Sequence, residues 1–82
     1  MSGASYELWE LDTGNLVGGY ETEAAALVIV RRSIERYGRE SVATLGLARE
    51  ARGRTTTIAV GDALAMRALA AEASPVRRVV PA

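Results

Sequence analysis

Residues 6–20 read YELWELDTGNLVGGY, and the architecture of the chain can be worked out from this stretch. Large apolar side chains flank the Asp-Thr-Gly triplet at 12–14 on both sides, which is typical of two antiparallel strands joined by a short turn. Glycine adopts a positive φ without steric cost, so Gly14 suits the last position of a three-residue hairpin loop. We therefore predict a strand over 6–11 and a returning strand over 16–20.

The length of this loop decides which residues of the two strands lie opposite each other. With three loop residues, the pairs are Leu11 with Asn15, Trp9 with Val17, and Tyr6 with Tyr20. The face that we expect a helix to cover receives the larger apolar set, namely Tyr6, Leu8, Leu16 and Tyr20. Gly18 lies within that set, where a helix backbone could approach closely. The open face receives Trp9, Leu11 and Val17. A two-residue loop is the alternative, and it would place Trp9 opposite Gly18.

The first helix has a signal at each end. Thr22 is a favourable N-cap residue, Glu23 lies at the positive end of the helix dipole, and Gly38 provides the C-terminal stop. One stripe of this helix is apolar and is expected to face the core: Ala26, Leu27, Val30, Ile34 and Tyr37. On the exposed side, the spacing of Glu35 and Arg39 predicts a weak ion pair.

Val28 and Ile29 lie outside that stripe, beside the polar arc of the helix. The helix therefore has more apolar surface than one sheet can cover. Two interpretations stay open: a second contact patch at these positions, or a broad core with a scatter of exposed apolar residues.

A second strand-strand-helix unit follows the first. Residues 41–50 alternate as a strand does, residues 51–54 (Ala-Arg-Gly-Arg) suit a turn, and residues 55–60 are β-branched enough to pair back. We expect the inward side chains of this pair to be Ala43, Leu45, Leu47, Ile58 and Val60. Asp62 is placed to cap an Ala-rich helix over 63–73, which the following Ser-Pro pair ends.

These signals predict an α+β fold, a two-layer sandwich of order ββαββα with a four-stranded, mainly antiparallel sheet and two helices on one face. Residues 1–74 are expected to form a single domain. Residues 75–82 are expected to be a mobile tail, with an added edge strand as the alternative. A single core of this size supplies only about 3–5 kcal/mol of net stability, so packing against a second copy would help.

The composition excludes several kinds of chemistry. The chain has no Cys and no His, so it lacks thiolate nucleophiles, imidazole bases, disulfides and zinc patterns, which leaves a carboxylate-only site as the remaining metal option. Glu7 and Glu10 are the closest carboxylate pair, but they point to opposite faces of a strand and cannot share a substrate. The Asp-Thr-Gly-Asn turn at 12–15 supplies too few oxygens in series for a calcium loop. We therefore predict a protein that binds rather than catalyses, with no cofactor.

Charge and hydropathy limit the kinds of partner that we expect for this chain. Ten basic and ten acidic residues balance, and the isoelectric point of about 6.2 lacks the basic excess of a general nucleic-acid binder. All ten basic residues are Arg, which together with the many Ala residues indicates the codon bias of a GC-rich bacterial genome. No stretch approaches the roughly 20 apolar residues of a membrane span, and the first residues lack the features of a signal peptide. We expect a cytoplasmic protein with no membrane partner.

Two binding hypotheses follow. The first is protein association, most simply as a homodimer, through an open sheet face with a second patch on the first helix. Its residues are Trp9, Leu11 and Val17, with Val28 and Ile29 as the second patch. The alternative is a nucleic-acid module that stacks bases on an aromatic side chain beside a basic hairpin. Its residues are Trp9, Arg49, Arg52 and Arg54.

Residues 6–40 also carry a resemblance to known proteins. The strand, the Thr-Gly-Asn turn at 13–15, the second strand and the helix start ETEAAAL at 21–27 resemble small bacterial proteins of unknown function from GC-rich genomes. The stretch is similar, too, to the hairpin-then-helix start of HicB-like antitoxins, whose helix begins with a comparable Thr, Glu, Ala and Leu pattern. That resemblance implies a small domain that binds a toxin protein and, often through an added segment, its own operator. No helix-turn-helix or ribbon arm follows the core here, so the resemblance does not extend to the DNA-binding part, and no functional residue is carried over.

Overall fold

The computed structural model of the chain describes residues 3–73. The elements, in chain order, are β1 (Ala4–Glu10), β2 (Asn15–Tyr20), α1 (Glu23–Tyr37), the short 3₁₀ helix η1 (Arg39–Val42), β3 (Leu45–Ala51), β4 (Arg54–Val60) and α2 (Asp62–Ala73). This order confirms the predicted ββαββα arrangement. The tail expected over 75–82 lies outside the described residues.

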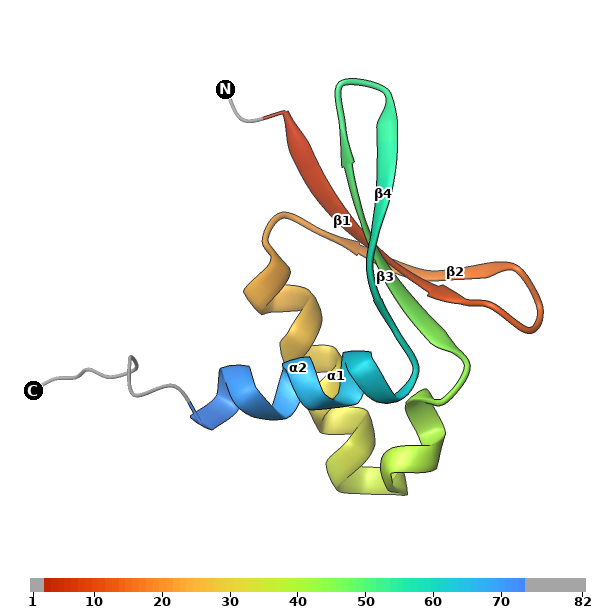
Figure 1. Ribbon diagram of the computed structural model, residues 1–82, viewed down its shortest axis with the longest axis vertical. Coiled ribbons are helices and arrows are strands. Elements are labelled where there is room, and N and C mark those ends of the chain that lie inside the picture. Colours follow the sequence, from red (N-terminus) through yellow and green to blue (C-terminus); the bar gives the residue numbers. More distant parts are fainter. Residues whose placement is uncertain (1–2, 74–82) are drawn as a thin grey trace, which may run out of the picture.

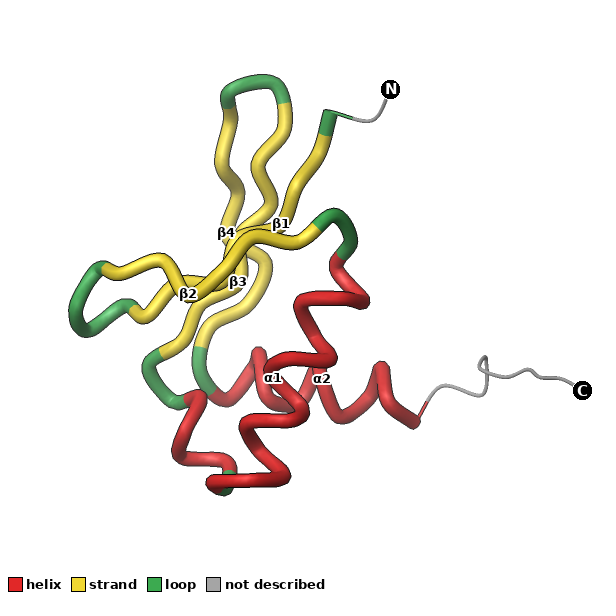
Figure 2. The backbone as a smooth tube through the Cα atoms, turned by 180° about the vertical axis from the view of Figure 1, so that it is seen from behind, coloured by secondary structure: helices red, strands yellow, loops and turns green. Residues whose placement is uncertain are grey.

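The four strands form one antiparallel sheet of order β2-β1-β3-β4. Two hairpins therefore lie side by side, joined through the central pair of β1 and β3. The two helices pack against each other and against the sheet, and the tip of the β3–β4 hairpin extends away from both (Figure 1). The view from behind shows the same separation of the helices from the hairpin tips (Figure 2). The predicted α+β class is confirmed.

The first hairpin departs from the predicted register halfway along its length. Tyr6 does pair with Tyr20, but a bulge follows Leu8, so that Trp9 pairs with Leu16 instead of Val17. The loop has four residues, because the pairing ends at Glu10 with Asn15. Leu11 leaves this ladder and its N–H donates instead to the carbonyl of Thr44, at 2.8 Å. Gly14 has the predicted positive φ, of 75°.

The bulge corrects two predictions about faces. Because each residue of shift turns a side chain to the other face, Leu16 lies with Trp9 on the open face and is not covered by a helix. Gly18 stays on the helix side, but the group nearest to a Cβ there would be the Tyr20 hydroxyl, at 2.6 Å, and not a helix backbone. The glycine therefore makes room for the ring of its neighbour.

The second hairpin also departs from the predicted strand bounds and alternation. Residues 39–42 form η1, so β3 begins at Leu45 rather than at residue 41 as predicted. Val42, the last residue of this 3₁₀ helix, is buried. The predicted turn at Arg52 and Gly53 is confirmed, because Ala51 pairs with Arg54. A bulge at Ile58 then reverses the alternation in β4. Ile58 packs against the core as predicted, whereas Val60 turns outward, which corrects the expectation for that residue.

Helix α1 begins and ends as its sequence signals predict. The Thr22 hydroxyl accepts a hydrogen bond from the backbone N–H of Ala25 at 3.1 Å, and the N–H of Gly38 donates to the Ile34 carbonyl at 2.8 Å. Tyr37, expected in the core stripe, is exposed in the last turn.

The ion pairs differ from the one predicted between Glu35 and Arg39. Glu35 pairs with Arg31 one turn earlier, at 3.0 Å. Arg39 lies past the end of α1 and pairs with Asp62, also at 3.0 Å. Helix α2 begins at Asp62, which corrects the prediction that this residue caps the helix from outside it.

The core forms between the helices and one face of the sheet. Its fully buried larger side chains are Leu8, Leu47, Leu64, Val30 and Val42. Small side chains where α1 meets α2, at Ala26, Ala65 and Ala68, are also buried and let the helices approach closely. Glu23 and Arg67 form an ion pair between the two helices, and the hydrogen bond and charge of Glu23 raise the pKa of Arg67. Because Leu8 of β1 and Leu47 of β3 point to the helices, their neighbours in sequence point to the open face.

Candidate functional site

A row of apolar positions crosses the open face of the sheet from edge to edge. Trp9 of β1 pairs with Leu16 of β2 on one side and with Gly46 of β3 on the other. Gly46 in turn pairs with Val60 of β4. All four strands thus contribute one position to a single line, which we call the apolar row: Leu16, Trp9, Gly46 and Val60.

The loop after β1 completes this row. A Cβ at Gly46 would lie 3.0 Å from a methyl carbon of Leu11, so the Leu11 side chain lies directly over the glycine. Leu11 is 50% exposed, Leu16 51% and Val60 43%. These are high values for large aliphatic side chains on a sheet face, and together they form a continuous apolar surface.

The polar end of Trp9 is already satisfied within the chain. Its indole Nε1–H donates to the Glu7 carboxylate at 3.1 Å. Glu7 lies two residues away on the same face of β1, so this hydrogen bond ties the indole ring to its own strand. If a partner covered the ring, the indole N–H would therefore still have its acceptor.

The structure brings together only part of the residue set predicted for protein contact. Trp9 and Leu11 lie in or over the apolar row, and Val17, at the bulge of β2, is exposed beside it. Val28 and Ile29 belong to α1 on the other side of the sheet, where both are half-buried and Ile29 packs against the core. They form no common surface with Trp9.

Two residues of the surface, Leu16 and Val60, were not predicted from the sequence. Both were assigned to the covered face by strict alternation, and in both strands a bulge reverses that alternation. A possible signal was Gly18-Gly19, because glycine in a strand often accompanies a bulge. No comparable signal marks Ile58.

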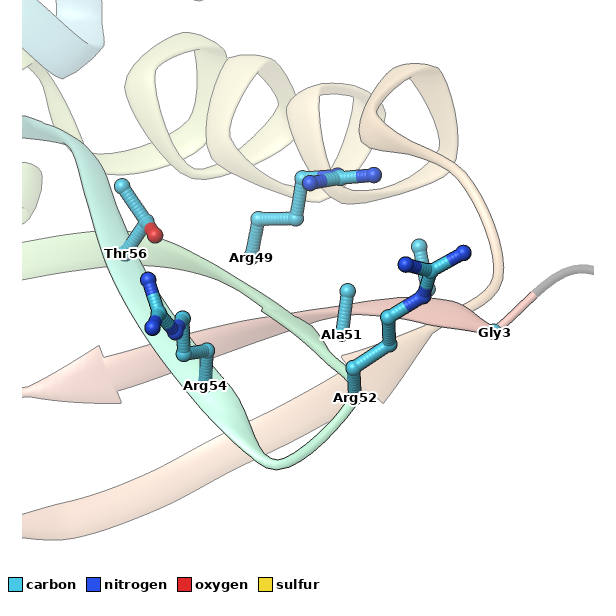
Figure 3. A pocket seen from close by; sticks show the side chains of 7 residues that line it. Gly3, Arg49, Ala51, Arg52, Arg54 and Thr56 are labelled. Carbon is cyan, nitrogen blue, oxygen red and sulfur yellow. The ribbon is translucent and has the colours of Figure 1, made fainter.

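A second feature lies on the helix-facing side of the sheet, beyond the helices, at the tip of the β3–β4 hairpin. It is an open hollow of about 780 Å³, which we call the arginine hollow. Its lining residues are Gly3, Ala4, Arg49, Ala51, Arg52, Arg54 and Thr56. The three arginine side chains rise from the same side of the hairpin around the small side chain of Ala51 (Figure 3). Among residues 3–73, no carboxylate forms an ion pair with any of these three guanidinium groups.

The arginines and Trp9 do not share a surface. Arg49 pairs with Tyr6 across the sheet, and Trp9 pairs with Gly46, three residues from Arg49. An odd separation along one strand places two positions on opposite faces. The stacking platform predicted as the alternative, with Trp9 beside the basic hairpin, is therefore not assembled within one molecule.

Within the described residues, no group of three or more acidic side chains is arranged to hold a metal ion. No helix in residues 3–73 combines the length and the apolar character that a membrane span requires. Comparison of the chain with protein-family models, with curated proteins and with solved structures finds no match. The chain is a small α+β domain with two separate candidate surfaces. The resemblance to HicB-like antitoxins stays a prediction.

Proposed function

We propose that this protein acts by association and that its open sheet face joins two copies of the chain into a homodimer. The observation that supports this proposal is the apolar row with Leu11, which crosses all four strands without an intervening charge. Face-to-face packing of two sheets is a common way to bury such a surface.

The position of the charges on the open face favours a second copy as the partner. The carboxylates of this face, Glu7 and Glu50, lie on one side of the apolar row, toward the β3–β4 hairpin tip. A twofold axis parallel to the row reverses the direction of the strands in the second copy, so its carboxylates lie on the opposite side of the row. The apolar rows then meet, and like charges stay apart.

The expected affinity is moderate. Each of the half-exposed aliphatic side chains would add only about 1 kcal/mol of apolar burial. Association itself costs several kcal/mol, so we expect a dissociation constant on the order of 10–100 µM. A dimer of this kind forms reversibly and depends on concentration.

Leu16→Lys tests the proposal with little risk to the fold. Leu16 is 51% exposed, so a lysine there can keep its charge in water in the monomer, whereas a dimer would bury that charge. Met66→Lys is the matched control, because Met66 is also an exposed apolar residue, at 58%, but lies on α2. Both variants have the same change in charge.

We expect the wild-type chain and Met66→Lys to increase in average mass toward a dimer as concentration rises, and Leu16→Lys to stay monomeric. Trp9→Ala should weaken association by about 2 kcal/mol, the loss typical of an aromatic anchor. An undiminished dimer in Leu16→Lys would contradict the open face as the interface. A wild-type chain that is monomeric at every concentration would contradict self-association and favour a different protein partner.

A further inference from the structure

The arginine hollow is separate from the open face and calls for its own explanation. Arg49 pairs with Thr56, and Ala51 with Arg54, so all four side chains point to the helix-facing side. Arg49 and Arg54 are thus diagonal neighbours, a relation that places two residues roughly 7–8 Å apart and their Cβ atoms somewhat closer. That separation lets two guanidinium groups reach a single small ligand between them.

The backbone at the tip of this hairpin indicates that Arg52 has a role besides closing the turn. Arg52 and Gly53 are the two loop residues, and both have positive φ, of 57° and 79°. This is the geometry of a type I′ turn, whose first position strongly favours Asn, Asp or Gly. An arginine there is strained, and such outliers cluster at functional sites.

The floor of the hollow is made of small residues. Ala4 and Ala51 face each other across β1 and β3, with Gly3 beside them, and neither helix covers them. Within residues 3–73 no side chain fills this space, and the three guanidinium groups surround an open volume. The described residues supply no anion to occupy it.

We propose that the arginine hollow binds a compact anion of the phosphate class, about the size of a diphosphate group. Guanidinium groups bind phosphate oxygens through paired, charge-assisted hydrogen bonds, and the Thr56 hydroxyl adds a further donor. The hollow, at about 780 Å³, is open and has ample room for such a group. None of the described residues that line the hollow is aromatic, so they offer no ring on which a base could stack, which favours a compact ligand over a nucleic-acid strand.

Calorimetric titration of the full chain with inorganic diphosphate tests this proposal. We expect saturable binding of one diphosphate per chain. Arg49→Gln and Arg54→Gln should each weaken it at least about tenfold, as expected for the loss of a charge-assisted contact. Arg32→Gln is the matched control: it removes the same charge from an exposed position of α1 outside the hollow, and should bind like the wild type.

Ala51→Leu separates a shaped site from simple charge attraction. It keeps all three arginines and fills the floor, so we expect it to lose diphosphate binding while the chain stays folded by circular dichroism. Arg52→Asn should also bind at least about tenfold more weakly, although asparagine suits the turn better.

Four results would overturn the proposal: no saturable binding by the wild type, an equal loss in Arg32→Gln, full binding by Ala51→Leu, or tighter binding of single-stranded oligonucleotides with affinity that grows with their length. The last result would favour nucleic acid as the ligand. Since the hollow and the apolar row lie on opposite faces of the sheet, failure here leaves the dimer proposal unaffected, and the reverse also holds.

Discussion

At the scale of single residues, the clearest conflict between local preference and observed structure is Arg52. The sequence predicts a turn at Arg52-Gly53, and the structure confirms it, but an arginine is an unfavourable residue for the left-handed conformation that it adopts there. Residue preferences can thus locate a turn. They do not reveal why a disfavoured residue occupies it, because the reason depends on neighbours brought in by the fold.

Replacing this arginine should therefore stabilise the protein. We expect Arg52→Asn to raise the free energy of unfolding by about 0.5–1 kcal/mol, because asparagine tolerates positive φ. Urea denaturation measures this change. Arg54→Asn, with ordinary strand geometry, is the comparison and should bring no gain. Equal or lower stability of Arg52→Asn would show that the turn is not strained.

Gly61 and Gly53 allow a second comparison between two single-residue variants. Both have positive φ, of 61° and 79°, but only Gly61 has a backbone atom, the Ala43 carbonyl oxygen, 3.0 Å from the position of a Cβ. We expect Gly61→Ala to cost at least about 1 kcal/mol more than Gly53→Ala, because it adds a clash with rigid backbone to the conformational cost. Equal losses in urea denaturation would mean that the Ala43 carbonyl moves aside.

At the scale of elements, the sequence predicts type and order well and register less well. The capped helix α1, the two hairpins and the Ala-rich α2 all follow from end signals and periodicity. The errors are at Leu16 and Val60, where a bulge in each edge strand reverses the alternation on which the faces were assigned. A bulge depends on how a strand fits its partner, and period-two patterning within one strand carries little information about that fit.

The start of α1 offers a quantitative test at this scale. Thr22→Ala removes the hydroxyl that accepts the Ala25 N–H, so we expect a loss of about 1 kcal/mol in the free energy of unfolding. Thr22→Ser keeps an oxygen in the same place and should retain most of the stability. If both variants unfold at the same denaturant concentration, the cap does not stabilise the helix.

At the scale of the whole molecule, the chain has more apolar surface than its own fold covers. The helices cover one face of the sheet, and Leu8 and Leu47 are fully buried there. On the other face the apolar row stays exposed, with Leu11 over Gly46. The sequence predicted Trp9 and Leu11 as members of an open face. Its full extent emerges only once four strands from both halves of the chain lie side by side.

Self-association through this exposed row can be tested on the average mass of the wild-type chain and of Leu16→Lys. Light scattering measures this mass over about a hundredfold range of concentration around the expected dissociation constant. We predict that the wild-type mass rises from that of one chain, 8.7 kDa, toward twice that value, and that Leu16→Lys stays at the mass of one chain throughout. Identical curves for the two proteins would contradict the assignment of the apolar row as the interface.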